Sequence, residues 1–212
     1  MAGSGAEPPY RLVLASASSA RLEILRRAGL APQVVVSNVD ETAIDVADPA
    51  ALAQALAVAK CREVSARLAV SSPTLVVGAD SVLDLGGTAL GKPADADEAR
   101  RRWRRMRGRA GRLVTGHCVR LVGGGDVRET SAAAAATVHF AALTDAEIDA
   151  YVATGEPLGV AGGFTIDGLG GPFVTRIEGD PHNVVGLSLP LLREMLRDLG
   201  VAWTALWPRP SR

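Results

Sequence analysis

The sequence is poor in the features that define several protein classes. Its 212 residues include only two cysteines, Cys61 and Cys118, and aromatic residues make up 4%. Two cysteines without metal-ligand spacing exclude a disulfide framework and fit a reducing cytoplasm. No apolar run approaches the roughly 20 residues that a membrane span requires. Lys plus Arg and Asp plus Glu both total 23, so net charge directs the chain neither to nucleic acid nor to a membrane.

Signatures of common enzyme classes are missing as well. No G-x-S-x-G segment is present, so the nucleophile elbow of a Ser-His-Asp hydrolase is not expected. Lys92 is followed by proline rather than by serine or threonine, which excludes a Walker phosphate-binding loop. His117, His139 and His182 are scattered without metal-ligand spacing, and packing or surface positions explain them best.

Strand-like and helix-like segments alternate along the chain, which predicts an α/β fold with a twisted mixed sheet flanked by helices. Gly123–Gly125 separates two strand-like runs and predicts a hairpin, although the alanines at 132–136 favour helix by propensity. Thr144 and Glu147 have capping-box spacing. The expected strands are Arg11–Leu14, Gln33–Val36, Thr74–Val77, Leu113–Val122 and Val127–Phe140, and the expected helices are Ala20–Ala28, Pro49–Leu68, Asp95–Arg107, Thr144–Val152 and Leu189–Leu199.

The ends of the chain are expected to lie outside the folded part. Residues 1–9, MAGSGAEPP, lack the basic and apolar regions of a signal peptide and indicate a disordered leader. No linker interrupts the rest, so we expect one domain over 10–203 and a flexible tail over 204–212. Together with the cysteine content, this predicts a cytoplasmic protein.

The turn LASASSAR, which ends at Arg21, is small enough for close backbone approach yet contains no glycine. One interpretation is a phosphate site, because a helix start offers unpaired N–H groups and Arg21 adds a guanidinium fork. The other is an N-cap at Ser18 or Ser19, with Glu23 reaching back as in a capping box. The local sequence by itself favours the cap.

Acids and a lysine stand at the ends of several expected elements. Asp40 and Glu41 follow the second strand, Asp80 follows an apolar run, and Lys92 lies in Gly-Lys-Pro. Open α/β sheets place their crevices beyond strand ends, where a cluster of Asp40, Glu41 and Asp80 could bind Mg²⁺. Taken singly, each acid is explained as well by an ordinary turn.

Arginines are concentrated in RRRWRRMRGRAGR, Arg100–Arg112. Basic residues with an interleaved aromatic, Trp103, are one pattern of nucleic-acid binding. On a helix, however, Ala99, Trp103 and Met106 form one apolar stripe and the arginines cover the remaining surface. A solvated helix face is therefore the favoured interpretation.

Taken in order, these segments resemble the Maf family of nucleoside triphosphate pyrophosphatases over about Leu12 to Leu199. Each motif is weak alone, and the ordered set is specific. The segments that carry the resemblance are LASASSAR, the acidic turn DET at Asp40–Thr42, Lys60 on the next helix, GADS at Gly78–Ser81, GKP at Gly91–Pro93, TVHFAALTDAEIDAYVATGEP, AGGFTIDGLG and VVGLSLPLL.

The resemblance implies an elongated, two-lobed fold around a central cleft, similar to that of inosine triphosphate pyrophosphatases. It implies hydrolysis of a nucleoside triphosphate to the monophosphate and pyrophosphate, in a house-cleaning role, with Mg²⁺ or Mn²⁺. The implied roles are triphosphate binding by Ser16, Ser18 and Arg21, metal binding by Glu41 and Asp80, and catalysis by Asp80, Lys60 and Lys92.

Three positions depart from the family's known branches. Ala20 stands where the branch acting on dTTP and UTP has arginine, Val160 where it has lysine, and Asp167 where it has glutamine. The branch acting on 7-methyl-GTP has tryptophan and glutamate at the first and last of these positions. A carboxylate only accepts hydrogen bonds, so Asp167 favours a base edge rich in N–H donors, such as that of guanine. The competing hypothesis is that Asp167 points to solvent and selects nothing.

Other functions remain as alternatives. The family has been linked to septum formation, so a non-catalytic nucleotide-binding regulator is one, although the intact Glu41, Lys60, Asp80 and Lys92 argue against it. An inosine triphosphate pyrophosphatase fits the motifs less well, and a nucleic-acid binder would act through Arg100–Arg112. The expected partner is a nucleoside triphosphate, without nucleic acid or membrane, and a homodimer stays open.

Overall fold

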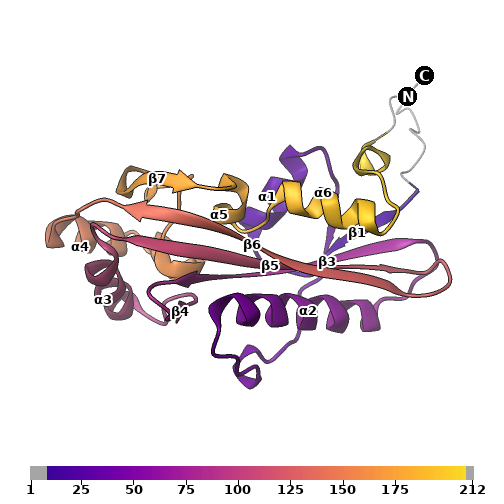
Figure 1. The fold of residues 1–212 in the computed structure, drawn as a ribbon, viewed down its shortest axis with the longest axis horizontal. Helices are drawn as coiled ribbons and strands as arrows, with labels where there is room; N and C mark the ends of the chain where they lie inside the picture. Colours follow the sequence, from indigo (N-terminus) through magenta and orange to yellow (C-terminus); the bar gives the residue numbers. More distant parts are fainter. Residues whose placement is uncertain (1–8, 209–212) are drawn as a thin grey trace.

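A seven-stranded mixed sheet runs through the molecule in the computed structural model, which describes residues 9–208 (Figure 1). The strand order is β2-β1-β3-β5-β6-β7, and the short β4 pairs with β3. β1 is parallel to both of its neighbours, and every other pairing is antiparallel. The strands are β1 (Arg11–Leu14), β2 (Gln33–Val34), β3 (Thr74–Asp84), β4 (Ala89–Leu90), β5 (Ala110–Val122), β6 (Arg128–Phe140) and β7 (Val174–Glu178).

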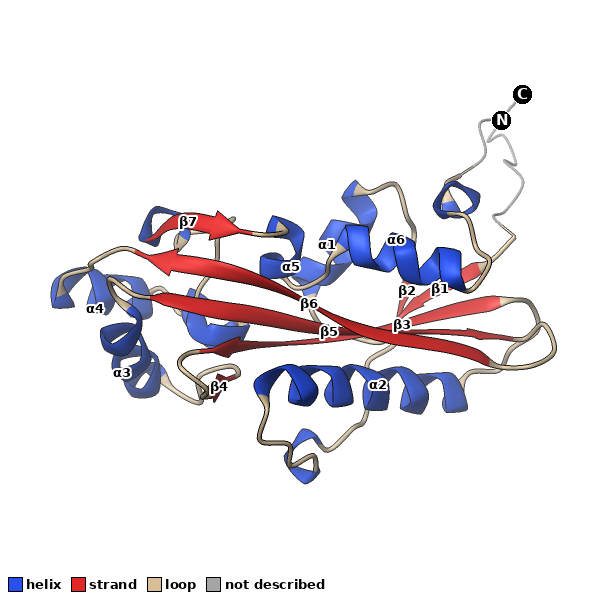
Figure 2. Cartoon of the chain, in the orientation of Figure 1, coloured by secondary structure: helices blue, strands red, loops and turns tan. Residues whose placement is uncertain are grey.

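Helices cover both faces of this elongated sheet (Figure 2). α2 lies along one face, α1, α5 and α6 lie along the other, and α3 and α4 pack at the end where β6 pairs with β7. The helices are α1 (Ser19–Arg27), α2 (Pro49–Arg67), α3 (Ala96–Met106), α4 (Asp145–Ala153), α5 (Pro181–Val185) and α6 (Leu189–Asp198). Short 3₁₀ turns occupy Glu41–Ala43, Glu156–Gly159, Ala161–Gly163, Gly171–Phe173 and Trp203–Leu206.

Alternate residues of the strands enter opposite layers of the core, because successive side chains of a strand point to opposite faces. Leu75 and Val77 join the cluster that contains residues of α1 and α6, whereas Val76 joins the cluster that contains residues of α2. At the other end of the sheet, Trp103 is fully buried and packs edge-to-face on Phe140. The long strands β3, β5 and β6 connect these two ends.

Two glycines allow α2 to lie unusually close to the sheet. A Cβ atom on Gly116 would lie 2.2 Å from the Ala53 carbonyl oxygen, and one on Gly78 would lie 2.4 Å from the Ala57 oxygen. Both distances are far below van der Waals contact, so only glycine fits at these positions. The close approach brings Lys60, on the same helix, down to the sheet.

The structure confirms most of the predicted elements. All five predicted helices are present within one residue at each end, and Thr144 and Glu147 form the predicted capping box. The hairpin is also confirmed, and the alanines at 132–136 lie in β6 because pairing with β5 overrides their helix propensity. The short elements β4, β7 and α5 were not predicted.

One strand prediction was wrong in a way that affects the site. Thr74–Val77 is only the start of β3, which continues through Gly78–Ser81 to Asp84 because it stays paired with β5 along its whole length. The strand predicted at Gln33–Val36 is correspondingly short, since only Gln33 and Val34 pair with β1.

Packed structure extends past residue 203, the predicted end of the domain. Residues of the predicted tail enter the 3₁₀ turn Trp203–Leu206, and the Trp207 indole N–H donates to the Ala28 carbonyl at 3.1 Å. Residues 1–8, nearly all of the predicted leader, and 209–212 lie outside the described part of the chain.

Candidate active site

The candidate site lies where β1 ends and β3 continues. Leu14, the last residue of β1, is in register with Val77 of β3. Within the described residues 9–208, no strand pairs with that edge of β3 again until β4 reaches Leu83. Asp80 was expected just beyond a strand end, and this was wrong, because it lies inside β3. It does lie beyond the end of β1, where the sheet edge is open, as ligand crevices of α/β sheets require.

Lys60 joins the two carboxylates that the sequence assigned to metal binding. Its Nζ atom lies 2.5 Å from Asp80 Oδ1 and 2.7 Å from Glu41 Oε1. The Lys60 and Asp80 side chains are 10% and 13% exposed, whereas that of Glu41 is 54% exposed. A nearly buried ammonium between two acids removes the repulsion that close carboxylates would otherwise feel.

Asp40 does not join this cluster, so the predicted group of three acids reduces to two. Its Oδ1 atom caps the Glu41–Ala43 turn by accepting the Thr42 N–H at 3.0 Å and the Thr42 hydroxyl at 2.6 Å. These bonds lower the pKa of Asp40, the hydroxyl contributing most. Asp40 thus has the ordinary turn role, and of the two acids in this turn Glu41 is the one that pairs with Lys60.

Arg21 lies on the α1 side of the same sheet edge. Its guanidinium donates to the Gly186 carbonyl at 2.7 Å, the Ser16 hydroxyl at 3.0 Å and the Ser81 hydroxyl at 3.0 Å. Burial lowers the pKa of Arg21, and the carboxylates of Asp80 and Glu41 raise it in opposition. The bond to Ser81 places the cation beside the strand neighbour of Asp80.

A chain of hydroxyls behind Arg21 runs across the sheet. Ser81 Oγ lies 2.9 Å from Thr115 Oγ1, which donates to the Asn183 carbonyl at 3.1 Å. Since Thr115 gives its only hydroxyl hydrogen to Asn183, it must accept from Ser81. Arg21, Ser81, Thr115 and Asn183 are therefore hydrogen-bonded in one fixed direction.

His117 fastens the segment that follows α5. It is fully buried, and its Nε2 atom accepts the Ser188 N–H at 2.9 Å. The Nδ1 atom then carries the proton and donates to the Thr115 carbonyl at 3.0 Å. Burial lowers the pKa of His117 to about 4, so the ring is neutral at pH 7. The segment it holds includes Gly186, whose carbonyl accepts from Arg21.

The serine turn before α1 contains the predicted N-cap and also places a serine beside Arg21, as a phosphate site would require. Ser18 is the N-cap and accepts the Arg21 N–H at 3.3 Å, as the capping interpretation predicted. The capping box with Glu23 was wrong, because Glu23 pairs instead with Arg27 at 2.8 Å, one turn along the helix. Ser16 is buried and faces the guanidinium of Arg21, so it lies within the site rather than in the cap.

Lys92 and Asp167, the two remaining predicted residues, stand apart from the cluster. Both are exposed, and neither makes a hydrogen bond or ion pair with any residue in the described range 9–208. A pocket of about 250 Å³ nevertheless connects Asp167 with the first turn of α1, since its lining includes Ala20, Asp167 and His182 of α5. Val160, the third departure from the family pattern, is not part of this lining.

The donor set fits a divalent cation with incomplete protein coordination. Within 9–208, no three His, Cys, Asp or Glu side chains converge in a metal-binding group. Glu41 and Asp80 each point one oxygen at Lys60, and their second oxygens make no hydrogen bond with any residue of the described part of the chain. Mg²⁺ commonly takes one or two carboxylates and completes its shell with water and substrate phosphates. These two acids could therefore hold such an ion.

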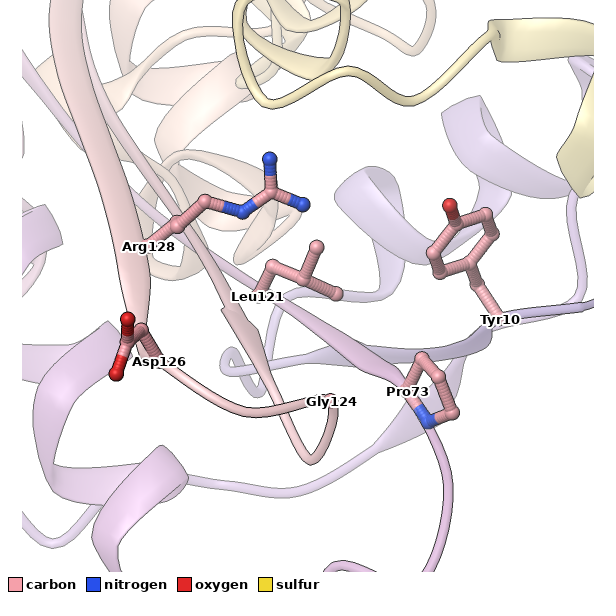
Figure 3. A pocket seen from close by; sticks show the side chains of 6 residues that line it. All are labelled: Tyr10, Pro73, Leu121, Gly124, Asp126 and Arg128. Carbon is pink, nitrogen blue, oxygen red and sulfur yellow. The ribbon is translucent and has the colours of Figure 1, made fainter.

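A second hollow, of about 170 Å³, lies beside the turn of the β5–β6 hairpin and is unrelated to these residues (Figure 3). Tyr10 and Arg128 extend from opposite sides of it, with Leu121 between them. None of the predicted site residues lines this hollow. Within the described part of the chain, no helix is long and apolar enough to cross a membrane.

Sequence reasoning did not find several residues that build the site. Ser81 stands inside the GADS motif and could have been identified from strand alternation. Neighbouring residues in a strand point to opposite faces, so Ser81 meets Arg21 on one face while Asp80 meets Lys60 on the other. Thr115, His117 and Asn183 are fully buried polar residues far apart in the sequence. Only the fold brings them together.

Comparison with known proteins places this site in a family. The family described as Maf-like protein matches residues 11–199. A nucleoside triphosphate pyrophosphatase of Streptomyces coelicolor is 59% identical over 201 residues, covering 95% of this chain and 96% of that protein. One of Salinispora tropica is 56% identical over 203 residues, covering 95% and 89%. The chain therefore belongs to the Maf-like protein family.

A solved structure, a nucleoside-triphosphatase / dITP/XTP pyrophosphatase of Mycobacterium abscessus, is more distantly similar. It shares 16% identity with this chain, covers 89% of it and 97% of its own length, and has a TM-score of 0.41.

Proposed function

We propose that this protein hydrolyses a nucleoside triphosphate to the nucleoside monophosphate and pyrophosphate, with Mg²⁺ or Mn²⁺. The observation that carries the proposal is the juxtaposition of Lys60, Glu41 and Asp80 at an open sheet edge, beside a half-buried Arg21 that donates to Ser81, the strand neighbour of Asp80. Close relatives named nucleoside triphosphate pyrophosphatase support the reaction class. Two cations, Lys60 and Arg21, beside two acids suit a polyphosphate and its metal counterion better than an uncharged substrate.

Ser16, Ser18 and Arg21 would hold the triphosphate. Ser16 Oγ accepts hydrogen bonds from Arg21 and from the Ser18 N–H, so its hydroxyl hydrogen remains available to a phosphate oxygen. The turn also precedes a nine-residue helix whose first N–H groups point toward the same space. Phosphate binding here requires no glycine, because Ala15, Ala17 and the serines are already small.

Hydrolysis would begin with attack of water on the α-phosphorus. The new bond joins the water oxygen to phosphorus, the bond to the bridging oxygen breaks, and pyrophosphate leaves with the bonding electrons. Asp80 would orient the water and accept its proton, while Lys60 offsets negative charge on the reacting phosphoryl group. Lys92, on its exposed turn, would offset charge on the departing pyrophosphate. A divalent cation held by Glu41 and Asp80 supplies further charge neutralisation when bound.

The pocket beside α1 is the place we propose for the base. Asp167 and Ala20 both line it, and alanine leaves room that a longer side chain would fill. Guanine presents two adjacent N–H donors, which match the two oxygens of Asp167, whereas uracil and thymine present one donor between two acceptors. We therefore propose tolerance of purines, including modified ones, without a strong preference for dTTP or UTP.

Release of pyrophosphate from a panel of normal and modified nucleoside triphosphates, with Mg²⁺, Mn²⁺ or chelator, tests the activity. Turnover of at least one nucleotide that stops with chelator is expected. Nucleotide binding without turnover by any panel member would favour the alternative, a non-catalytic regulator of cell division. We also propose a cytoplasmic location, consistent with the free thiols of Cys61 and Cys118.

A further inference from the structure

The arginines of α3 do not all form the solvated face that the sequence predicted. Arg100 pairs with Asp97 and Asp149 at the surface, and Arg101 is exposed without a hydrogen bond or ion pair among residues 9–208. Arg102 differs from both. Its side chain is 12% exposed, and it turns away from solvent toward the loop that carries Lys92.

Arg102 and Glu98 hold this loop at both ends. Arg102 Nη1 donates to the Gly91 carbonyl at 2.6 Å, and Glu98 Oε2 accepts the Ala94 N–H at 2.7 Å. The two side chains are tied to each other by an Arg102 Nε–Glu98 Oε1 hydrogen bond of 3.0 Å. The Ala94 N–H and, to a lesser degree, Arg102 lower the pKa of Glu98. We call this pair the Arg102–Glu98 clamp.

The clamp holds the backbone on both sides of Lys92 and Pro93, since Gly91 precedes these two residues and Ala94 follows them. The exposed Lys92 side chain makes no hydrogen bond or ion pair with residues 9–208, and a lysine side chain has four freely rotating carbon bonds. The place its ammonium can reach is therefore set by the backbone of the turn. On its other side, the Gly91 carbonyl also accepts the Gly162 N–H at 3.0 Å, which joins the turn to the AGGF segment.

We propose that Arg102 and Glu98 are positioning residues for Lys92. The proposal rests on the role given to Lys92 in the proposed function. Charge stabilisation in phosphoryl transfer depends on placement, and a displacement of about 1 Å can cost on the order of 10²-fold in rate. Stability of the helix start explains the bond from the Ala94 N–H to Glu98, which is the third residue of α3, but it does not require Arg102 to reach the Gly91 carbonyl on the far side of Lys92.

The first test separates kcat from KM. Arg102→Ala is expected to lower kcat about 10-fold and to change KM less than about 2-fold, since the charge that Lys92 offsets grows in the transition state. Arg102→Lys keeps a cation near Glu98 and is expected to recover part of the rate. Arg101→Ala, the neighbouring exposed arginine, is the matched control and is expected to leave kcat unchanged. Equal losses in Arg101→Ala and Arg102→Ala would overturn the proposal.

A double-mutant cycle with Lys92→Ala decides whether Arg102 acts through Lys92. In the Lys92→Ala background, Arg102→Ala is expected to lower kcat by less than about 2-fold. A full 10-fold loss in both backgrounds would overturn the inference while leaving the proposed function intact. A Lys92→Ala variant with normal kcat would overturn both the inference and the role of Lys92, while pyrophosphate release would still stand.

Amide hydrogen exchange gives a readout that does not depend on activity. The Ala94 amide is expected to exchange at least about 10-fold faster in Glu98→Ala than in the wild type, whereas exchange in the β5–β6 hairpin stays the same. Unchanged Ala94 exchange would mean that the clamp does not hold the turn. Loss of protection throughout the chain would mean general destabilisation, and would also overturn the proposal.

Discussion

Replacing Asp80 with asparagine removes one negative charge from the candidate site while keeping the shape of the side chain. Asp80 is one of two acids on a nearly buried Lys60, so the variant leaves this cation paired with Glu41 at 2.7 Å. We expect kcat/KM for pyrophosphate release to fall 10²- to 10⁴-fold, which corresponds to about 3–5 kcal/mol of barrier.

The effect on the fold should be smaller than the effect on the rate. Leaving a buried charge without any partner costs about 3–5 kcal/mol. Because Lys60 keeps Glu41 as a partner, we expect the unfolding free energy to fall by only about 1–2 kcal/mol. A domain with a stability of roughly 5–15 kcal/mol remains folded after such a loss. A thousandfold loss of rate would therefore not arise from unfolding.

Steady-state pyrophosphate release and urea unfolding, measured on the same preparations, separate the two effects. Asp84→Asn is the matched control, because Asp84 lies four residues further along β3. Among residues 9–208 its side chain hydrogen-bonds only the Gly87 N–H, at 2.7 Å, and an asparagine side chain can accept the same bond. The control should keep near-normal activity. A folded Asp80→Asn variant with kcat within about 5-fold of the wild type would refute the site assignment.

Four further outcomes are expected. Lys92→Ala should lower kcat more than it raises KM, and an effect on KM alone would contradict its role at the leaving group. Asp167→Gln should shift the kcat/KM ratio of GTP over UTP toward UTP, whereas a wild-type preference for UTP above about 10-fold, unchanged by the substitution, would contradict the base pocket. His117 has a folded pKa of about 4, below its unfolded value, so stability should fall as pH drops from about 6.5 to 4. In urea unfolding, the wild type should lose about 2–3 kcal/mol more than His117→Gln over that range, and parallel pH curves would disprove the idea. Gly116→Ala should cost about 3 kcal/mol by pushing a Cβ atom into α2, while Gly159→Ala, whose Cβ would meet nothing, should cost less than about 0.5 kcal/mol in the same assay.

The sequence by itself determined the features that depend on neighbouring residues. Apolar spacing located the five long helices to within one residue, and Thr144 with Glu147 marked a capping box that the structure contains. The glycine turn at 123–125 marked the central hairpin. These features can be predicted from the sequence because caps, turns and amphipathic stripes depend on residues no more than four positions apart. The ordered motifs also identified the family, which the comparisons confirm.

Tertiary structure alone decided how the site is assembled. Lys60 meets Asp80 because two glycines let α2 approach the sheet, and Arg21 reaches a carbonyl 165 positions away because α5 packs beside α1. Asp80 lies in a strand rather than beyond one because pairing with β5 extends β3 past the end of β1. Hydrogen bonds and ion pairs between residues distant in sequence depend on the packing of whole elements, and no local pattern specifies that packing.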